Sequence, residues 1–85
     1  MNTITKDDLW NLSFGSAIQM LLNKYVYMYL EDNSLYQGII TAIRKADNVN
    51  PTTKDYLPVG FLINDKYVDI TKIHQIDIAT HEREQ

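Results

Sequence analysis

The fold of this chain is decided by the stretch KYVYMYLEDNSLYQGII, residues 24–40. Within it, tyrosines at every second position alternate with Val26, Met28 and Leu30. A period of two with aromatic and branched side chains is typical of a β-strand. The aliphatic face of this strand must join the core. The tyrosine face is either a surface for a partner or a second buried layer.

A polar turn follows this strand, and a second strand returns from it. We expect a three-residue turn, Asp32–Ser34, which places Leu30 opposite Tyr36 and Met28 opposite Gly38. A glycine in mid-strand commonly marks a sharp bend or a close backbone approach. The returning strand is therefore expected to bend at Gly38.

The segments on both sides of this hairpin complete the predicted order. Before it, apolar residues three and four apart in 5–23, with Thr5 and Ser13 as candidate N-caps, predict one amphipathic helix or two short ones. After it, the polar residues 45–57 predict a long loop. The remaining predicted elements are a strand at 58–64, a tight turn at 64–66, a strand at 67–70, a helical turn at 71–72, a strand at 73–78 and a charged tail at 79–85.

Five short strands without covering helices must close on themselves or leave open edges. The sequence therefore predicts one domain, residues 1–85, that is mainly β with an N-terminal α-helix. Its strands, within residues 24–78, are expected to form a small, strongly bent five-stranded β-barrel with the helix plugging one end.

Composition restricts the function more than it defines it. Of 85 residues, 45% are hydrophobic and 22% charged, as in globular domains. The absence of cysteine excludes disulfides, thiolate metal sites and thiol nucleophiles. The N-terminus lacks the pattern of a signal peptide and no apolar run suits a membrane span, so we expect a cytoplasmic protein with no membrane partner. The net charge of −3 disfavours binding to nucleic acid.

The stretch LLNKYVYMYLEDNSLYQGII resembles the first signature of the Sm and Sm-like proteins, the group that includes bacterial Hfq. The C-terminal half, GFLINDKYVDITKIHQIDI, also resembles other bacterial Sm-like domains such as the YolD type. The resemblance implies an SH3/Sm-like barrel. Asn33 stands where the family usually has glycine. The matching residues are Val26, Met28, Leu30, Asp32, Tyr36, Gly38 and Ile40.

Members of this family bind uridine- or adenine-rich RNA through a ring pocket built from two loops. The resemblance places Arg44 where the first loop usually has an Asp, and Asn48 where it usually has an Asn. The Arg-Gly dipeptide that usually precedes the last strand is missing, and Asp69 lies in that region. With the nearby lysines, the candidate RNA-binding residues are Arg44, Lys45, Asn48 and Lys72.

The most unusual feature is the row of three tyrosines. Aromatic rings on a barrel strand can stack unpaired bases, or can form a protein interface, where tyrosine is enriched. In a third reading, Trp10, Phe14 and Leu21 of the N-terminal helix cover them. Leu35 and Ile39 lie on the same outward face, which favours burial or protein contact over a solvated stacking surface. The candidate partner-binding residues are Tyr25, Tyr27, Tyr29 and Leu35.

No catalytic or metal-binding pattern is found in the sequence. His74, Asp77 and His81 are the best metal candidates, but strand alternation puts His74 and Asp77 on opposite faces. The carboxylates lie in turns or at polar strand positions, where we expect them to be solvated. We therefore predict no enzyme activity, no metal and no cofactor.

Three functions remain open. The first is a non-catalytic binding or regulatory module that acts through protein contacts, self-association included. The second is an Sm-like RNA-binding protein. The third is a small acidic inhibitor from a mobile genetic element that mimics nucleic acid, which would need its carboxylates arrayed on one face.

Overall fold

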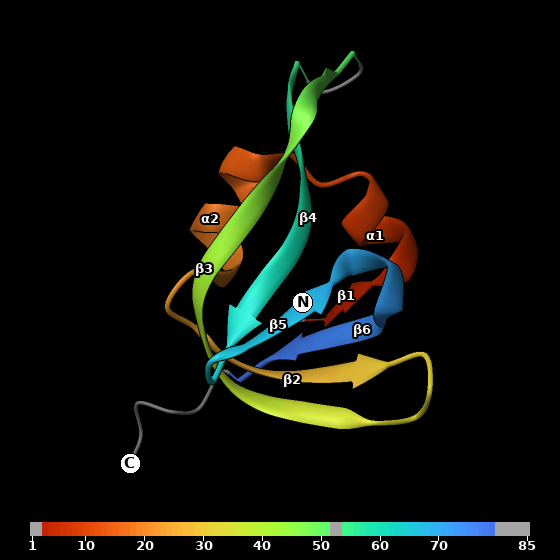
Figure 1. Cartoon of the computed structure of the whole chain (residues 1–85), viewed down its shortest axis with the longest axis vertical. Helices are drawn as coiled ribbons and strands as arrows, with labels where there is room; N and C mark the ends of the chain where they lie inside the picture. The colour runs from red at the N-terminus through yellow and green to blue at the C-terminus, as the bar shows by residue number, and fades with distance from the viewer. Residues whose placement is uncertain (1–2, 52–53, 80–85) are drawn as a thin grey trace.

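The computed structural model describes residues 3–51 and 54–79. It is mainly β, as predicted, with helices near the N-terminus (Figure 1). The elements in chain order are β1 (Thr3–Thr5), α1 (Lys6–Trp10), α2 (Phe14–Leu21), β2 (Tyr25–Leu30), β3 (Leu35–Asn50), β4 (Asp55–Ile63), β5 (Lys66–Asp69), the 3-10 turn η1 (Ile70–Lys72) and β6 (Ile73–Ile78).

The strands form a single antiparallel sheet in the order β1-β6-β2-β3-β4-β5. Six strands are present where five were predicted. The additional strand is β1, whose three residues are too few to show a period in the sequence. In the described part of the chain β1 and β5 do not pair with each other, so the sheet is open and the predicted barrel closure is not confirmed.

The β2–β3 hairpin has the predicted faces but a different register. Its turn is Glu31–Asn33, one residue earlier than expected, because the Leu30 N–H donates to the Ser34 carbonyl oxygen at 2.9 Å. Met28 consequently lies opposite Tyr36, two residues from the predicted pairing. A shift of two keeps every side chain on its face, so the predicted core face is preserved. The last residue of this turn, Asn33, has a left-handed backbone conformation, with φ of 72°.

The predicted bend at Gly38 is confirmed. β3 pairs with β2 as far as Ile39 and with β4 from Ile40 onward, so one long strand belongs to both halves of the sheet (Figure 1). Gly38 has φ of +151°, and a Cβ added there would collide with the side chain of Asn64. Glycine is therefore favoured at position 38 for two reasons: its backbone conformation is one that other residues rarely adopt, and the Asn64 side chain leaves no room for a Cβ.

The predicted loop at residues 45–57 is wrong for its described residues, because 45–50 belong to β3 and 55–57 to β4, and these two strands form an irregular hairpin. Two of its polar residues, Lys45 and Asp55, contact α2. The Lys45 Nζ lies 4.5 Å from the centre of the Tyr56 ring and 5.9 Å from that of Phe14. Asp55 accepts a hydrogen bond from the Gly15 N–H at 2.9 Å. Cation–π contacts and a helix cap thus replace the apolar residues that would normally indicate a strand.

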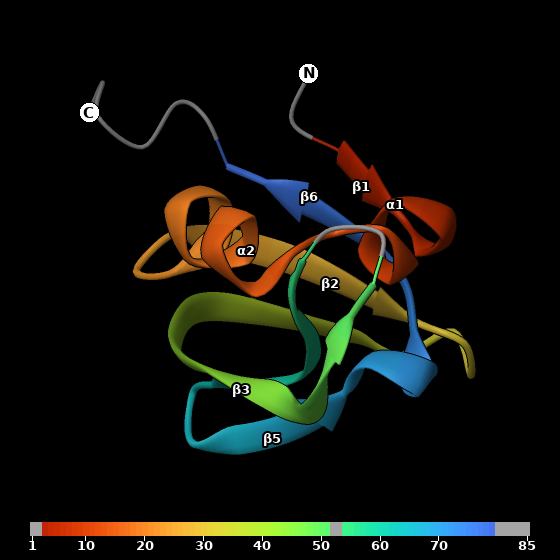
Figure 2. The same ribbon diagram turned by 90° about the horizontal axis from the view of Figure 1, so that it is seen from above.

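The two helices begin at the predicted caps, and α1 lies against β1 and β6 while α2 lies against β3 and β4 (Figure 2). The Thr5 side chain accepts from the Asp8 N–H, and Ser13 accepts from the Ser16 N–H, each at 3.2 Å. Leu9 and Leu21 reach the core, which also contains the inward residues of the sheet. The core consists of Ile4, Leu9, Leu21, Val26, Met28, Ile40, Phe61, Ile63, Val68, Ile70, Ile73 and Ile76.

Candidate partner-binding face

The outer side of the β2–β3 hairpin carries a group of large side chains that we call the tyrosine face. In the sheet, Tyr25 lies opposite Ile39 and Tyr29 opposite Leu35. The exposed fractions are 36% for Tyr25, 38% for Tyr29, 48% for Leu35 and 46% for Ile39. The half-buried Tyr27 completes the face, and its ring meets that of Tyr25 edge-on at 5.7 Å between centres.

The N-terminal helices do not cover this face. Leu21 is fully buried in the core cluster that contains Val26 and Met28, which point to the other side of β2. Trp10, offered as a cover by one reading of the sequence, is itself 42% exposed. The tyrosine face is therefore solvent-accessible in the single chain.

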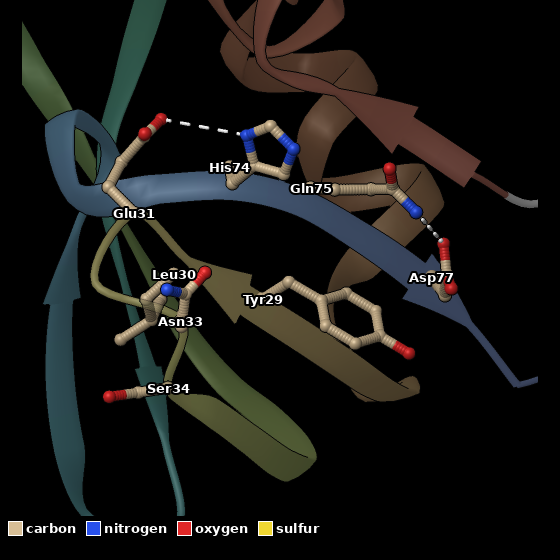
Figure 3. A pocket seen from close by; sticks show the side chains of 8 residues that line it. All are labelled: Tyr29, Leu30, Glu31, Asn33, Ser34, His74, Gln75 and Asp77. Atoms are coloured by element: carbon tan, nitrogen blue, oxygen red, sulfur yellow. Dashed lines mark hydrogen bonds and ion pairs between the residues drawn. The ribbon is translucent and has the colours of Figure 1, made fainter.

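An open hollow of about 450 Å³ adjoins the tyrosine face (Figure 3). It is formed where the β2–β3 turn meets β6. Tyr29 forms part of its wall, and Glu31 and Asp77 also contribute to it, as Figure 3 shows. The lining residues are Tyr29, Leu30, Glu31, Asn33, Ser34, His74, Gln75 and Asp77.

The expectation that His74 and Asp77 lie on opposite faces is wrong, because both line this hollow. Strict alternation fails at the start of β6. Tyr29 pairs with Gln75, but the next residue of β2, Leu30, pairs with Ile73, so the register shifts between them. Such irregularities re-aim side chains. The other metal candidate, His81, lies outside the described residues.

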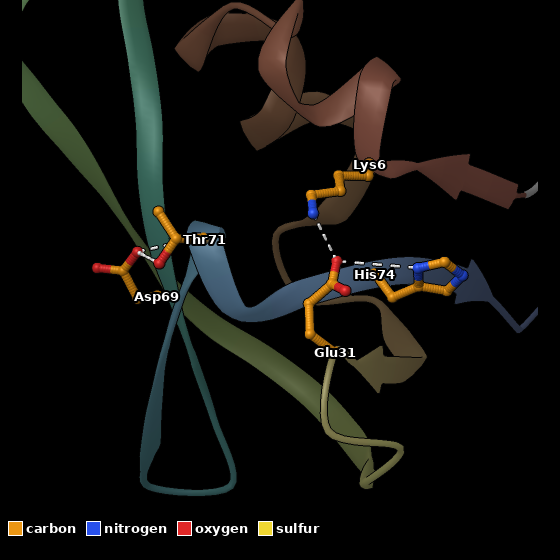
Figure 4. Close-up of polar contacts among 5 residues, drawn as sticks. All are labelled: Lys6, Glu31, Asp69, Thr71 and His74. Atoms are coloured by element: carbon orange, nitrogen blue, oxygen red, sulfur yellow. Dashed lines mark hydrogen bonds and ion pairs between the residues drawn. The ribbon is translucent and has the colours of Figure 1, made fainter.

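Two carboxylates contribute the charge of this hollow. Glu31 Oε2 lies 2.8 Å from Lys6 Nζ and 3.8 Å from His74 Nδ1 (Figure 4). The hydrogen bond from Lys6, followed by the charges of Lys6 and His74, lowers the pKa of Glu31. Asp77 Oδ1 accepts from the Thr3 hydroxyl at 3.0 Å and from the Gln75 amide at 2.9 Å.

Three of the four predicted RNA-binding residues lie together. Arg44, Lys45 and Asn48 border a second open hollow of about 410 Å³, which we call the Arg44 hollow. Lys72 lines a different hollow, beside Glu31. Sequence reasoning missed Tyr67, which is 48% exposed and also borders the Arg44 hollow. The available signal was a glycine in mid-strand, because a Cβ at position 60 would collide with the Tyr67 ring. Asp47 and Asp69 line the same hollow.

Other carboxylates form structural hydrogen bonds, among them Asp69, which was expected to be solvated. Asp8 accepts from the Thr5 N–H at 3.2 Å in a capping box at the start of α1. Asp69 begins η1 by accepting from the Thr71 N–H at 2.9 Å and from its hydroxyl at 2.8 Å (Figure 4). These bonds lower the pKa of Asp69. Over residues 3–51 and 54–79, no three His, Asp or Glu side chains are grouped so that they could hold a metal ion.

No family model, curated protein or solved structure matches this chain. In the described part of the chain, no helix is long and apolar enough to cross a membrane.

Proposed function

We propose that this chain is a small, non-catalytic binding module whose tyrosine face contacts another protein, a second copy of the chain included. The observation that carries the proposal is the segregation of the two faces of the β2–β3 hairpin. One face supplies Val26, Met28 and Ile40 to the core, and the other exposes a contiguous group of tyrosine and aliphatic side chains. Contiguous apolar surface of this kind marks interaction sites.

The chemistry of the face suits protein contact. Tyrosine is enriched at interfaces because its ring buries a large area at a low entropy cost and its hydroxyl can still be hydrated. A stable interface buries about 800 Å² on each partner. That is about a seventh of this chain's surface of 5400 Å². An interface of that size would extend beyond the tyrosines into the adjoining hollow.

Sedimentation velocity tests the proposal with the wild type and Tyr27→Ser. The variant removes the central ring of the face and its edge-on contact with Tyr25. Tyr67→Ser is the matched control, because Tyr67 is an exposed tyrosine on β5, at the far edge of the sheet from β6. Circular dichroism establishes that each variant is folded.

We expect either concentration-dependent self-association or co-sedimentation with a partner identified by mass spectrometry from a cell extract. Either association should weaken in Tyr27→Ser and persist in Tyr67→Ser. A wild-type chain that stays monomeric and retains no identified partner would overturn the proposal. Equal loss in both variants would exclude the tyrosine face as the site.

A second candidate function is RNA binding, and the grouping of Arg44, Lys45 and Asn48 around one hollow beside Tyr67 favours it. We propose with it that the sharply bent sheet is an open variant of an SH3/Sm-like barrel. The aromatic ring would stack a base while the cations contact phosphate. Two carboxylates on the same hollow, Asp47 and Asp69, reduce the attraction for phosphate, which is why this function ranks second.

Fluorescence anisotropy with short uridine-rich and adenine-rich oligonucleotides at low salt tests this candidate. RNA binding should strengthen as salt falls, because phosphate contacts release counterions. RNA binding should weaken in Arg44→Ala. It should remain in Lys24→Ala, because Lys24 directly precedes β2 and does not border the Arg44 hollow. Absence of salt-sensitive binding would remove this candidate without affecting the first.

A further inference from the structure

The hollow beside the tyrosine face combines an aromatic wall with two carboxylates, of which Glu31 is paired with Lys6. Tyr29 belongs both to the tyrosine face and to the hollow, so the two surfaces are continuous. Its ring is 38% exposed. Glu31 comes from the β2–β3 turn and Asp77 from β6, and both carboxylates line the hollow with Tyr29 (Figure 3). A partner covering the tyrosines would therefore also meet these carboxylates.

Each carboxylate keeps one oxygen available. On Glu31, the contacts with Lys6 and His74 both use Oε2. On Asp77, the hydrogen bonds from Thr3 and Gln75 both use Oδ1. Within the described residues, Glu31 Oε1 and Asp77 Oδ2 accept no hydrogen bond. An ionised carboxylate can accept about four hydrogen bonds, so capacity remains for a donor from outside the chain.

From this arrangement we infer that the partner is a basic segment of another protein, and that one of its arginine side chains enters the hollow. The inference rests on the proposed binding function and specifies its partner. A guanidinium is planar, stacks on a tyrosine ring and donates up to five hydrogen bonds. It can therefore stack on the Tyr29 ring while it donates to one of the available carboxylate oxygens. A lysine offers one point charge and stacks less well.

Charge also distinguishes a basic partner from a second copy. The chain carries a net charge of −3, so two copies repel each other, whereas a basic segment is attracted toward the hollow. The tyrosine face contributes no Asp, Glu, Lys or Arg of its own. Apolar contact would hold the segment, and the arginine would fix its position.

A peptide titration followed by amide NMR of the full chain tests the inference. The probe is the capped peptide acetyl-Leu-Arg-Leu-amide. Its control replaces arginine with citrulline, which has nearly the same shape but no charge, because a carbonyl oxygen stands in place of one NH2 group of the guanidinium. We expect the arginine peptide to shift the amides of Tyr29, Glu31, Gln75 and Asp77. We expect the citrulline peptide to bind about fivefold more weakly.

Variants of the chain provide the second comparison. Asp77→Asn and Glu31→Gln keep the shape of the hollow and remove one charge each, so each should weaken binding of the arginine peptide about two- to fivefold. Asp47→Asn removes a carboxylate from the Arg44 hollow and should leave the affinity unchanged. Well-dispersed amide spectra establish that the variants remain folded.

The experiment can disprove the arginine site without disproving the proposed binding function. Equal binding of the arginine and citrulline peptides at the tyrosine face would disprove the arginine site and leave the binding function intact. Shifts confined to other parts of the chain, or no shifts with either peptide, would also disprove it. Self-association through Tyr27 without a response to arginine would identify a second copy as the occupant.

Discussion

The side chain of Asn64 fills the space that a Cβ of residue 38 would need. Asn64 is the first residue of the β4–β5 turn, and its amide nitrogen donates to the Gln37 carbonyl oxygen at 2.5 Å. Gly38 lies next to the point at which β3 leaves β2 and joins β4. The bend of the sheet is thus linked to a tight turn 26 residues further along the chain.

We predict that Gly38→Ala lowers the free energy of unfolding by about 2–4 kcal/mol, because it adds backbone strain to the collision with Asn64. Adding Asn64→Gly should recover about 1 kcal/mol by removing the collision while the strain persists. Urea denaturation of the two single variants and the double variant measures this coupling. Strictly additive effects would show that the two residues do not interact.

The two faces of β2 should differ in their contribution to stability. Met28→Ala should lower the free energy of unfolding by about 2–5 kcal/mol, because the Met28 side chain is fully buried. Tyr29→Ser should cost less than about 1 kcal/mol, because Tyr29 is 38% exposed and is not among the side chains packed against the core. Chemical denaturation provides both values. A loss in Tyr29→Ser as large as that in Met28→Ala would place the tyrosines in a structural layer.

Acid should release the β3–β4 hairpin from α2. Hydrogen bonds to Asp55 from the Gly15 N–H and the Tyr56 N–H, followed by the charge of Lys45, lower the pKa of Asp55 below its usual 3.8. The folded chain therefore binds this proton more weakly than the unfolded chain. The stabilisation is complete above the unfolded pKa and is lost as the pH falls through the folded one.

The matching experiment follows the melting temperature from neutral pH to about pH 2. Asp55→Asn should lower the melting temperature at neutral pH and reduce its further loss below about pH 4. Asp47→Asn, on the same hairpin, is the control and should retain the wild-type profile. If Asp55→Asn and the wild type lose the same stability in acid, Asp55 does not anchor the hairpin.

Much of the architecture could be predicted because the information is local. The period-two pattern of residues 25–30 gives both faces of β2, Gly38 marks the bend, and Thr5 and Ser13 mark the helix starts. The predicted turn lies one residue too late because Asp32–Ser34 and Glu31–Asn33 are equally suitable turn sequences. The predicted register of β2 and β3 is wrong by two residues for the same reason. A shift of two residues leaves each side chain on its predicted face, so the core face is still correct.

The elements that were missed depend on partners distant in the sequence. The segment 45–57 lacks strand periodicity, and its hairpin is held by Lys45 over aromatic rings and by Asp55 at the start of α2, 40 residues away. The three residues of β1 become a strand only beside β6. The hollow between Tyr29 and Asp77 depends on the register shift in β6, which strict alternation cannot reveal.

Photo-crosslinking from the tyrosine face tests the central claim most directly. p-Benzoylphenylalanine is introduced at position 29 and, as the control, at position 67, where the native tyrosine is more exposed. Irradiation of cells that produce each variant should yield a defined protein adduct from position 29, a dimer or a complex with another protein, and none at position 67. Equal adducts from both positions, or no adduct from position 29, would contradict the assignment of this face as the binding surface.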